Sequence, residues 1–397
     1  MKVLLLGVGL QGKAALHDLV YSDNVSEIIA ADREIDTLKQ LVANKQYPNV
    51  HCEFLDANEQ DDIDRLMALK PDVIIDLLPG QFMDSIATSA VKHGIHLVNT
   101  LYTTPKIKEL AEEAKRKEIA ILPEFGLDPG IDLVLLGEAV RGLEKIEVIN
   151  SYGAGIPELE AADNPLKYKV TWIFEGVLGT YFRAGRIIRN GQVVEIKENE
   201  VFNPENIHEI AIEGIGKLEA YPNGDALDYL QAIGIEEQSE SYKQIQQMGR
   251  YSMRWPGHCA FWKKLVDLHL LDNEPITIHS VEINRRSFLA KVIEPHIQLE
   301  PNEKDLAILL IELVGVKDGV KTRVVYQLID KRDLETGFTA MSRTVGYTAS
   351  IGAQLLGTGK VTKKGLLSPA TDIPYDAFVE ELRKRGITIS TKFESIQ

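Results

Sequence analysis

Three glycines near the N-terminus have the spacing of a phosphate-binding loop. Gly7, Gly9 and Gly12 form the pattern G-x-G-x-x-G directly after a short apolar run. In such a loop the first glycine permits a tight turn, the second lets the backbone approach a pyrophosphate, and the third lets the next helix pack closely on the strand. The free N–H groups at the start of that helix point at the phosphates. The sequence therefore predicts a dinucleotide site, which also includes the loop residues Leu10 and Gln11.

Charged residues at the ends of the second and third predicted strands bear on whether the site prefers NAD or NADP. Asp32 ends the second predicted strand, 20 residues after Gly12. A carboxylate there can accept a hydrogen bond from the ribose 2′-hydroxyl and repels a 2′-phosphate, which favours NAD over NADP. Arg33 follows directly and offers the opposite preference, since a guanidinium can pair with that phosphate or stack on adenine. Asp56, after the third strand, either borders the adenine or is a solvated loop acid.

Two further turns fall where parallel strands are predicted to end. Leu78 and Pro79 follow the fourth strand, at the edge where a doubly wound sheet binds ligands, although a plain turn would use the same residues. Glu124 and Asp128 follow the sixth strand, so we expect Asp128 to lie near the nicotinamide. Pro129 biases Asp128 toward an extended conformation and suits the first turn of a helix. Capping of that helix is the plainer role for Asp128.

A local excess of positive charge lies between residues 250 and 264, where four bases and no acid occur in a chain of formal charge -15. Within it Arg254 stands beside Trp255, just before a Pro-Gly turn. A guanidinium held there can bind both oxygens of a carboxylate, and a surface ion pair is the alternative. His258 has the side chain of an acid–base group near neutral pH, although packing or capping is its more common role.

These residues need a framework that brings them together. The first 126 residues alternate short apolar strands with amphipathic helices, which predicts a doubly wound parallel sheet, the Rossmann fold. From about residue 145 the strands become longer and more polar, as at 168–175 and 186–197, which indicates a mixed α+β domain. Asn-Gly at 190–191 and Asp-Gly at 318–319 predict hairpin turns. We therefore expect an α/β chain with a dinucleotide-binding domain at 1–126, a substrate domain at 127–344 and a helical C-terminal segment at 345–397.

Composition excludes several classes of protein. With 59 acids against 44 bases, the surface repels nucleic acid and anionic lipid. Two cysteines cannot form a disulfide scaffold or a cysteine-rich zinc site, and they fit a reducing compartment. The histidines show no metal-binding spacing, and no apolar run is long enough to span a membrane. We expect a cytoplasmic protein without a metal.

Five motifs, in order, resemble those of the saccharopine reductase-like family. The resemblance spans nearly the whole chain and implies a Rossmann domain interrupted by a substrate domain, with the segment after about residue 345 packing back on the Rossmann domain. It also implies a homodimer. The motifs are the glycine loop with Asp32, GLDPGID at 126–132, NPLKYKVTW at 164–172, YPNGD at 221–225 and MRWPGH at 253–258.

The resemblance assigns roles at matching positions. It implies that Asp128 contacts the substrate amine beside the cofactor, that Trp172 flanks the nicotinamide and that Arg254 holds the substrate α-carboxylate. Tyr102 matches a substrate-side position. One position departs from the family: Gly224 stands where saccharopine reductases carry an Arg that grips the glutarate part of saccharopine. Because a buried carboxylate without a partner is costly, we expect a small amino acid with one carboxylate.

The expected activity follows from that departure. Within the family the chain is most similar to the lysine 6-dehydrogenases, which implies NAD-dependent oxidative deamination of the ε-amine of L-lysine. The product semialdehyde can cyclise to a piperideine carboxylate. Asp128, Glu124 and His258 are the candidates for the base that removes the amine proton. The alternatives are a saccharopine or carboxynorspermidine dehydrogenase or reductase, and a non-catalytic dinucleotide-binding sensor.

Overall fold

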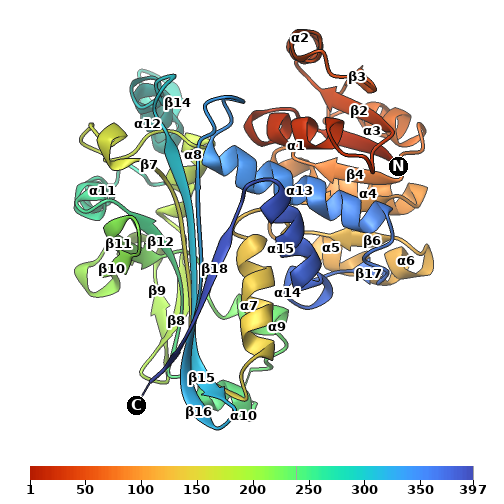
Figure 1. Cartoon of the computed structure of the whole chain (residues 1–397). Coiled ribbons are helices and arrows are strands. Elements are labelled where there is room, and N and C mark those ends of the chain that lie inside the picture. The colour runs from red at the N-terminus through yellow and green to blue at the C-terminus, as the bar shows by residue number, and fades with distance from the viewer. Residues whose placement is uncertain (238, 397) are drawn as a thin grey trace. The chain divides into compact units, whose positions relative to one another are not determined.

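The computed structural model describes residues 1–237 and 239–396, and the chain divides into two compact units (Figure 1). The first unit comprises Met1–Glu138 and Ser342–Thr388, and the second comprises Ala139–Met341 and the chain from Ile389 onward. The expected boundary after residue 126 thus differs from the observed one, because most of helix α7 (Ile131–Arg141) belongs to the first unit. The expected C-terminal segment divides between the units, because its last strand pairs with the sheet of the second unit.

The first unit is built on a seven-stranded parallel sheet with the strand order β17-β6-β5-β4-β1-β2-β3. The order of β1 to β6 is that of a doubly wound dinucleotide-binding fold, so the predicted Rossmann sheet is confirmed. The strand order reverses between β1 and β4, and ligands bind such sheets at the carboxyl ends of these strands. The strands are β1 (Lys2–Leu6), β2 (Glu27–Asp32), β3 (Val50–Phe54), β4 (Val73–Asp76), β5 (His96–Asn99), β6 (Ala120–Leu122) and β17 (Gly365–Leu366).

Helices pack on this sheet and bury its apolar strands, as expected for a parallel sheet. One core cluster joins β1, β2, β4 and β5 to helices α3 and α4. The helices are α1 (Leu10–Val20), α2 (Ile35–Lys45), α3 (Gln60–Met67), the 3₁₀ turn η1 (Gly80–Phe82), α4 (Met83–His93), α5 (Pro105–Glu109), α6 (Ala111–Arg116), α7, α13 (Ala340–Gly357), α14 (Pro369–Asp372) and α15 (Tyr375–Lys384).

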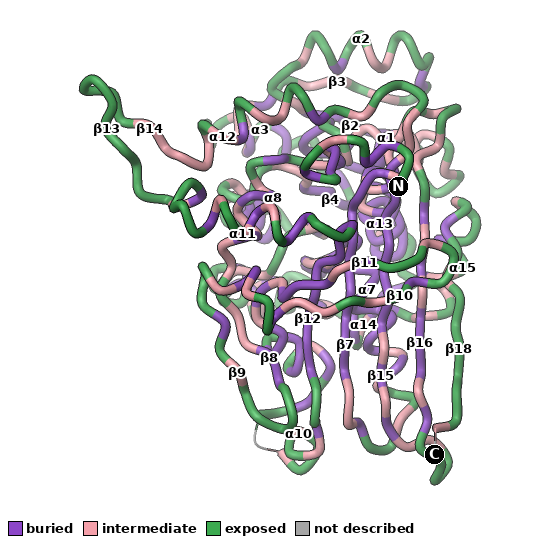
Figure 2. The backbone as a smooth tube through the Cα atoms, turned by 90° about the vertical axis from the view of Figure 1, so that its left-hand side faces the viewer, coloured by how far each residue is buried: buried purple, intermediate pink, exposed green. Residues whose placement is uncertain are grey.

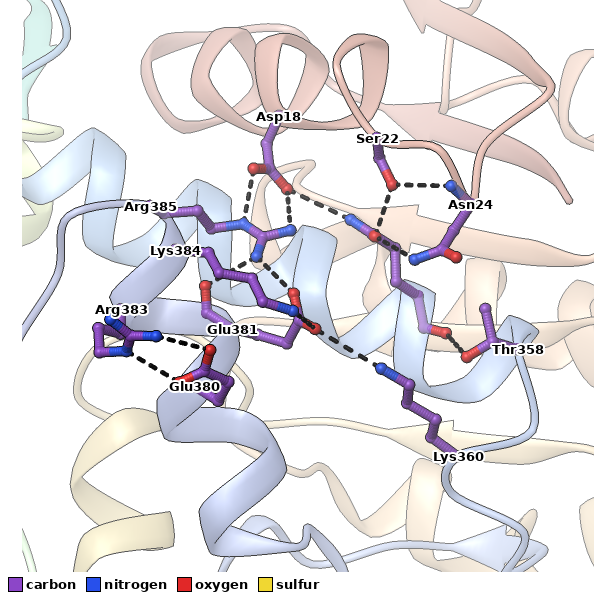
Figure 3. A network of polar contacts seen from close by, with 11 residues as sticks. Asp18, Ser22, Asn24, Thr358, Lys360, Glu380, Glu381, Arg383, Lys384 and Arg385 are labelled. Atoms are coloured by element: carbon purple, nitrogen blue, oxygen red, sulfur yellow. Dashed lines mark hydrogen bonds and ion pairs between the residues drawn. The ribbon is translucent and has the colours of Figure 1, made fainter.

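The C-terminal helices support the helix that follows the glycine loop. Gly346 of α13 lies so close to α1 that a Cβ atom at this position would be 2.5 Å from the carbonyl oxygen of Gln11. Polar contacts join the same elements (Figure 3): Asp18 of α1 accepts two hydrogen bonds from Arg385 and one from Gln354. The start of the chain and its C-terminal segment are therefore parts of one folded unit.

The second unit contains a nine-stranded mixed sheet along the path β10-β11-β12-β7-β15-β16-β18, with β8 paired to β12 and β9 paired to β8. Only β12 and β7 run parallel. A separate hairpin, β13 (Ile276–Ile278) and β14 (Val281–Ile283), is largely exposed (Figure 2). The sheet strands are β7 (Lys145–Pro157), β8 (Gly185–Arg189), β9 (Gln192–Ile196), β10 (His208–Ile212), β11 (Gly216–Pro222), β12 (Gln247–Arg254), β15 (Asp305–Lys317), β16 (Val320–Lys331) and β18 (Ile389–Ser395).

Both predicted hairpin turns of this unit are confirmed. Asn190 and Gly191 connect β8 to β9 with φ angles of 52° and 71°, and Asp318 and Gly319 connect β15 to β16 with φ angles of 50° and 74°. Two successive positive φ angles are those of a type I′ turn, whose twist matches the strands that it joins.

The strand predicted at 168–175 is wrong. Helix α8 (Phe174–Thr180) begins within this range, and the preceding residues are irregular. The side chain of Asn164 accepts from the N–H of Leu166 and donates to the carbonyl of Tyr168, so a local side-chain turn replaces strand pairing. The apolar residues there, including Tyr168 and Phe174, are buried in an aromatic core instead.

None of the helices in the described residues has the length and apolar character needed to cross a bilayer. The other helices of the second unit are short. They are α9 (Asp228–Ala232), α10 (Glu240–Gln244), α11 (His258–Asp267) and α12 (Arg285–Ile293), with 3₁₀ turns η2 (Leu159–Ala161), η3 (Glu198–Glu200), η4 (Pro204–Asn206) and η5 (Glu294–His296).

Candidate functional site

The glycine loop joins β1 to α1 and has the geometry of a phosphate cradle. A Cβ atom on Gly7 (φ +85°) would lie 2.9 Å from the carbonyl oxygen of Leu77, and one on Gly12 would lie 2.1 Å from that of Gly7. Gly9 differs, because a Cβ atom there would meet nothing within 4 Å. Two of the glycines thus serve packing within the protein, whereas the third faces open space.

The start of α1 leaves backbone donors available. No side chain caps this end of the helix, and its first turn carries no acid. Leu10, the first residue of α1, is exposed, and Gln11 follows it. The first N–H groups of a helix have no partner within the helix, so these groups and the open space at Gly9 fit the pyrophosphate of a dinucleotide.

Asp32 ties the end of β2 to the glycine loop. Its Oδ2 accepts from the N–H of Val8 at 2.7 Å, and its Oδ1 accepts from the N–H of Glu34 at 2.9 Å. A carboxylate oxygen has two acceptor sites, so each oxygen keeps one for a ribose hydroxyl. Arg33 is exposed beside it.

Asp56 lies at the neighbouring strand end, since β2 and β3 pair in parallel. Its Oδ1 accepts from the backbone and the side chain of Asn58. These bonds, and to a lesser extent the charge of Arg33, hold the pKa of Asp56 below its usual range. Both acids predicted for the adenosine side are therefore at one edge of the sheet.

A buried carboxylate that sequence analysis missed holds the loop after β4. Asp76, the last residue of β4, accepts from the N–H of Leu78 at 3.1 Å and from the side chain of Asn99 at 2.9 Å. Asn99 in turn accepts from the N–H of Leu101 at 2.6 Å. Burial raises the pKa of Asp76 to about 6. The signal was present, because Asp76 is the one acid in an otherwise apolar strand, and the turn at Leu78 and Pro79 depends on it.

Glu124 holds the loop after β5. Its backbone N–H donates to the carbonyl of Leu101 at 3.0 Å, and its Oε1 accepts from the N–H of Thr103 at 2.9 Å. Glu124 itself has a positive φ of 57°, a conformation that costs a non-glycine residue free energy. Tyr102 stands in the sequence between Leu101 and Thr103, the two residues that Glu124 bonds, and it is 36% exposed. The carboxylate of Glu124 is thus engaged by the backbone, and its role as a base stays a prediction.

The segment after β6 leads into α7. Asp128 precedes Pro129 through a cis peptide bond. At the start of the helix, the buried Asp132 accepts from the N–H of Gly130 at 2.6 Å. This bond holds the residue that precedes the helix, and the capping role considered for Asp128 stays a prediction. The contact of Asp128 with a substrate amine stays a prediction.

Arg254, the last residue of β12, is 6% exposed and lies among tyrosines. Its Nη1 donates to the carbonyl of Met253, and its guanidinium carbon lies 5.4 Å from the ring centre of Tyr168 and 5.9 Å from that of Tyr221. No carboxylate pairs with Arg254 among residues 1–237 and 239–396. Burial disfavours its charge, but Tyr221, Tyr181 and Tyr168 raise the pKa of Arg254 above the usual range.

Several buried polar atoms around Arg254 have no hydrogen-bond partner within the described chain. An unpaired buried polar atom costs about 1–3 kcal/mol, so a cluster of them is unusual in a free protein. The rings of Tyr168 and Tyr221 lie beside the guanidinium of Arg254. The atoms concerned are Tyr168 Oη, Thr171 Oγ1, Tyr221 Oη and Arg254 Nε.

His258, the first residue of α11, is fully buried. Its Nδ1 lies 2.7 Å from the carbonyl oxygen of Leu166, and its Nε2 lies 2.8 Å from the hydroxyl of Tyr181. Burial, together with the charge of Arg254, lowers the pKa of His258 to about 3. These contacts favour the packing role that the sequence also allowed, and the acid–base role predicted for His258 stays untested.

Trp172 packs on the aromatic core of the second unit, where a Cβ atom on Gly176 would be 2.8 Å from its ring. Trp172 and Arg254 therefore belong to the second unit, whereas Asp128 and the glycine loop belong to the first. That the two groups meet around one nicotinamide and one substrate stays a prediction.

Another guanidinium lies beside the position where this chain departs from the family. A Cβ atom on Gly224 (φ +78°) would be 2.9 Å from Cδ of Arg183. The Nη1 of Arg183 donates to the side chain of Asn223 at 3.5 Å. The charge expected to be missing at Gly224 is thus present nearby, on a residue from a different segment.

A doubly wound sheet with this glycine loop is the architecture of a dinucleotide-binding domain. Residues 3–122 match the family model described as the saccharopine dehydrogenase NADP binding domain, and residues 126–387 match the saccharopine dehydrogenase C-terminal domain. The chain therefore belongs to the saccharopine dehydrogenase family.

Curated relatives match nearly the whole chain at low sequence identity. The chain is 26% identical to the saccharopine dehydrogenase [NADP(+), L-glutamate-forming] of Pyricularia oryzae, with 98% of both proteins covered. It is 23% identical to the carboxyaminopropylagmatine dehydrogenase of Synechocystis, over 97% of the chain and 96% of that protein. It is 26% identical to the mitochondrial alpha-aminoadipic semialdehyde synthase of Mus musculus over 98% of the chain, and it spans about half (48%) of the length of that relative.

A solved structure shares the fold. The apo saccharopine dehydrogenase (L-Glu forming) from Saccharomyces cerevisiae has a TM-score of 0.85 and 23% identity, covering 99% of this chain and 100% of that one. The family model and the fungal relatives are named for NADP. These names run opposite to the preference for NAD that Asp32 predicts.

Proposed function

We propose that the chain oxidises, or in reverse reduces, the carbon–nitrogen bond of a carboxylated amino-acid amine, with Arg254 holding one carboxylate. The observation that carries the proposal is the buried guanidinium of Arg254, for which no ion pair with an acid is found among residues 1–237 and 239–396. Burying an unpaired charge costs several kcal/mol. A ligand carboxylate would supply the missing charge and accept hydrogen bonds from the guanidinium.

The glycine loop, Asp32 and the start of α1 would hold the dinucleotide. A bound nicotinamide would supply the hydride acceptor for the substrate carbon next to nitrogen. The nitrogen must first be neutral, so a base takes its proton, and a carbon–nitrogen double bond forms as the hydride leaves. Water then adds to that bond, and the products are a carbonyl compound and a free amine. We assign the orientation of the amine to Asp128, and Tyr102 and Trp172 to the walls of the site.

The nature of the amine separates two substrates. Relatives named for saccharopine and for carboxyaminopropylagmatine support a secondary amine, and Arg183 beside Gly224 would supply a guanidinium for a further carboxylate. Gly224 itself supports the smaller lysine, since the family Arg is absent there. We favour the secondary amine, of the saccharopine type, and lysine is the second candidate.

The test is a substrate panel with purified protein. Saccharopine, lysine and a carboxylated polyamine are each offered with NAD and with NADP from neutral to alkaline pH, and cofactor reduction is followed by absorbance. We expect turnover with saccharopine. Turnover with lysine alone would select the second candidate, and cofactor binding without any turnover would leave the non-catalytic sensor.

The cofactor preference is a separate proposal. We favour NAD, because the carboxylate of Asp32 lies at the end of β2 with free acceptor sites, whereas the names of relatives favour NADP. Dissociation constants for the two dinucleotides should favour NAD, and Asp32→Ser should shift the ratio toward NADP. Tighter binding of NADP by the unaltered protein would overturn this preference.

A further inference from the structure

The two tyrosine rings beside Arg254 each end in a buried hydroxyl group. The guanidinium carbon of Arg254 lies 5.4 Å from the ring centre of Tyr168 and 5.9 Å from that of Tyr221. A cation within about 6 Å of such a centre is attracted to the ring. Both tyrosines are at most 1% exposed, and neither hydroxyl has a hydrogen-bond partner in the described chain. The attraction accounts for the rings but not for the hydroxyls.

A phenylalanine at either position would supply a similar ring without an unpaired polar atom. Burying a hydroxyl that has no partner lowers the stability of the folded protein. Most buried polar side-chain atoms in native proteins have a partner, so two unpaired hydroxyls beside one buried cation are unusual. Their placement indicates a ligand with acceptor atoms, which the chain itself does not supply.

The strand register places Tyr221 and Arg254 on one face of the sheet. Tyr221 of β11 lies opposite Ser252 of β12, and side chains two residues apart on a strand point to the same face. Tyr221 is therefore a diagonal neighbour of Arg254, within reach of a long side chain. Glu219 lies directly opposite Arg254, but its carboxylate accepts from two backbone N–H groups at the start of α11. The acid on this face is thus already engaged.

Tyr168 reaches the same guanidinium from the irregular segment before α8, and this segment is held in place. The side chain of Asn164 accepts from the N–H of Tyr168 at 3.4 Å and donates to its carbonyl at 2.7 Å. The next residue, Lys169, is buried and pairs with Glu303 at 2.6 Å. The ring of Tyr168 stacks on Phe174 with 6.1 Å between centres. A side chain with locked neighbours keeps its geometry before a ligand binds.

We propose that the hydroxyls of Tyr168 and Tyr221 donate hydrogen bonds to the same substrate carboxylate that Arg254 holds. This inference rests on the proposed function and adds two substrate-binding residues to it. A carboxylate has about four acceptor sites. An edge of the guanidinium that includes the unpaired Nε supplies two donors, and the two hydroxyls supply two more. A carboxamide has one acceptor oxygen and brings an NH₂ group to a guanidinium that cannot accept.

Removal of either hydroxyl should have opposite effects on stability and on binding. Tyr168→Phe and Tyr221→Phe should each raise the melting temperature of the free protein by roughly 2 °C, because an unpaired buried group is lost. Each should also raise KM for the carboxylated substrate about tenfold, as for one hydrogen bond to a charged group, with unchanged affinity for the dinucleotide. A hydroxyl that serves only the fold would lower the melting temperature when removed. An unchanged KM in either variant would overturn the inference.

The substrate in this test is whichever of saccharopine and lysine turns over in the panel above. The comparison compound carries a carboxamide in place of the α-carboxylate of the lysine part, which for lysine is lysinamide. Selectivity for the carboxylate over the carboxamide should fall about tenfold in each phenylalanine variant. Equal losses for the two compounds would show a general defect of the site and contradict the inference.

Two other buried tyrosines of the second unit are matched controls. The hydroxyl of Tyr181 lies 2.8 Å from Nε2 of His258, and that of Tyr152 lies 3.2 Å from Nε2 of His208. Because each hydroxyl has a partner, Tyr181→Phe and Tyr152→Phe should lower the melting temperature. Tyr152 belongs to a different core cluster, so Tyr152→Phe should also leave KM unchanged. A higher melting temperature in these two variants as well would contradict the distinction between paired and unpaired hydroxyls.

The proposed function can fail separately. If neither compound turns over, or if Arg254→Lys leaves KM for the carboxylate unchanged, the proposed function is wrong and the roles of Tyr168 and Tyr221 fall with it. If Arg254→Lys raises KM but Tyr168→Phe and Tyr221→Phe do not, the proposed function stands and only the roles of the two tyrosines are wrong.

Discussion

The glycine loop of the first unit and the buried arginine of the second both offer positive charge to an anion, but they do so by opposite means. The loop uses backbone N–H groups at the exposed start of α1, and it is formed within residues 7–12. The arginine site uses side chains from several segments, including Tyr168, Tyr181, Tyr221 and Arg254, and all four are buried.

The difference lies in how each site affects the free protein. Water can bond to the exposed N–H groups of the loop, so an empty loop costs little. The side-chain atoms around Arg254 are buried, and those without a hydrogen-bond partner in the described chain raise the free energy of the folded protein. We therefore expect a substitution at Arg254 to weaken substrate binding without lowering the stability of the protein. In the glycine loop, we expect a substitution at a tightly packed glycine to lower both stability and dinucleotide binding.

The largest expected effect comes from Gly12. Gly12→Ala places a Cβ atom 2.1 Å from the carbonyl oxygen of Gly7, so the helix must move, and we expect at least about 3 kcal/mol of destabilisation with loss of dinucleotide binding. Gly9→Ala is the matched control: nothing lies within 4 Å, so stability should change by less than about 1 kcal/mol, while dinucleotide affinity falls. Urea unfolding and fluorescence titration measure both, and equal effects at the two glycines would break the comparison.

The next largest effect is expected at Arg254. Arg254→Met removes a buried charge without a partner, so the free energy of unfolding should stay the same or rise. Loss of the substrate carboxylate contact should lower kcat/KM by roughly 100-fold, equivalent to about 3 kcal/mol. Thermal unfolding and steady-state kinetics test the two halves of this prediction. A variant that unfolds more easily than the parent would show that Arg254 serves the fold rather than a ligand.

A third prediction concerns pH. Burial raises the pKa of Asp76 from 3.8 to about 6, so the folded chain binds this proton more tightly than the unfolded chain. The resulting stabilisation is complete below about pH 4 and is lost as the pH rises through 6, amounting to about 3 kcal/mol. Burial also raises the pKa of Asp305 to about 6, so Asp76→Asn should reduce the loss of stability between about pH 4 and 6 by its own share and leave that of Asp305, as measured by urea unfolding at a series of pH values. An unchanged slope in the variant would contradict the prediction.

Asp64 provides a control of opposite sign for the pH experiment. Its bonds to Lys92 and Gln60 hold the pKa of Asp64 below the usual range, so its contribution is lost as the pH falls rather than as it rises. Asp64→Asn should therefore leave the slope between about pH 4 and 6 assigned to Asp76 in place. The charge of Arg254, whose pKa lies above the usual range, does not vary over this interval.

The smallest effect on stability is expected at the contact between Arg385 and α1, the helix that follows the glycine loop (Figure 3). The guanidinium of Arg385 makes two bonds to Asp18 at 2.6 and 2.9 Å, and both side chains are largely buried. Arg385→Gln should lower the free energy of unfolding by about 2 kcal/mol. Arg383 makes a similar pair with Glu380, but both side chains are exposed, so Arg383→Gln should change stability by less than about 0.5 kcal/mol. Differential scanning calorimetry of the two variants decides whether burial sets the difference.

Much of the fold could be predicted from the sequence because the signals are local. The alternation of apolar strands and amphipathic helices predicts the Rossmann sheet, and the Asn-Gly and Asp-Gly pairs predict both hairpins. The predicted strand at 168–175 fails for a physical reason: its apolar residues enter an aromatic core, and Asn164 bonds the backbone that a neighbouring strand would otherwise bond.

The residues of the candidate sites also divide into those that the sequence predicts and those that it does not. The glycine loop and Asp32 lie where the spacing predicts them, because a loop of six residues between a strand and a helix has few available conformations. Sequence analysis missed Asp76, although its place as the one acid of an apolar strand was a signal, and it missed Tyr181, since nothing in the local sequence reports that its hydroxyl meets His258.

The sequence by itself therefore determined the dinucleotide loop, the parallel sheet and the presence of a basic segment around Arg254. Only the tertiary structure decided that Arg254 is buried beside Tyr168 and Tyr221, and that His258 is buried against the hydroxyl of Tyr181 instead of facing solvent. The physical reason is the range of the interactions. Backbone geometry is set by neighbours along the chain, whereas burial and the loss of water around a charge depend on segments that meet only when the chain is folded.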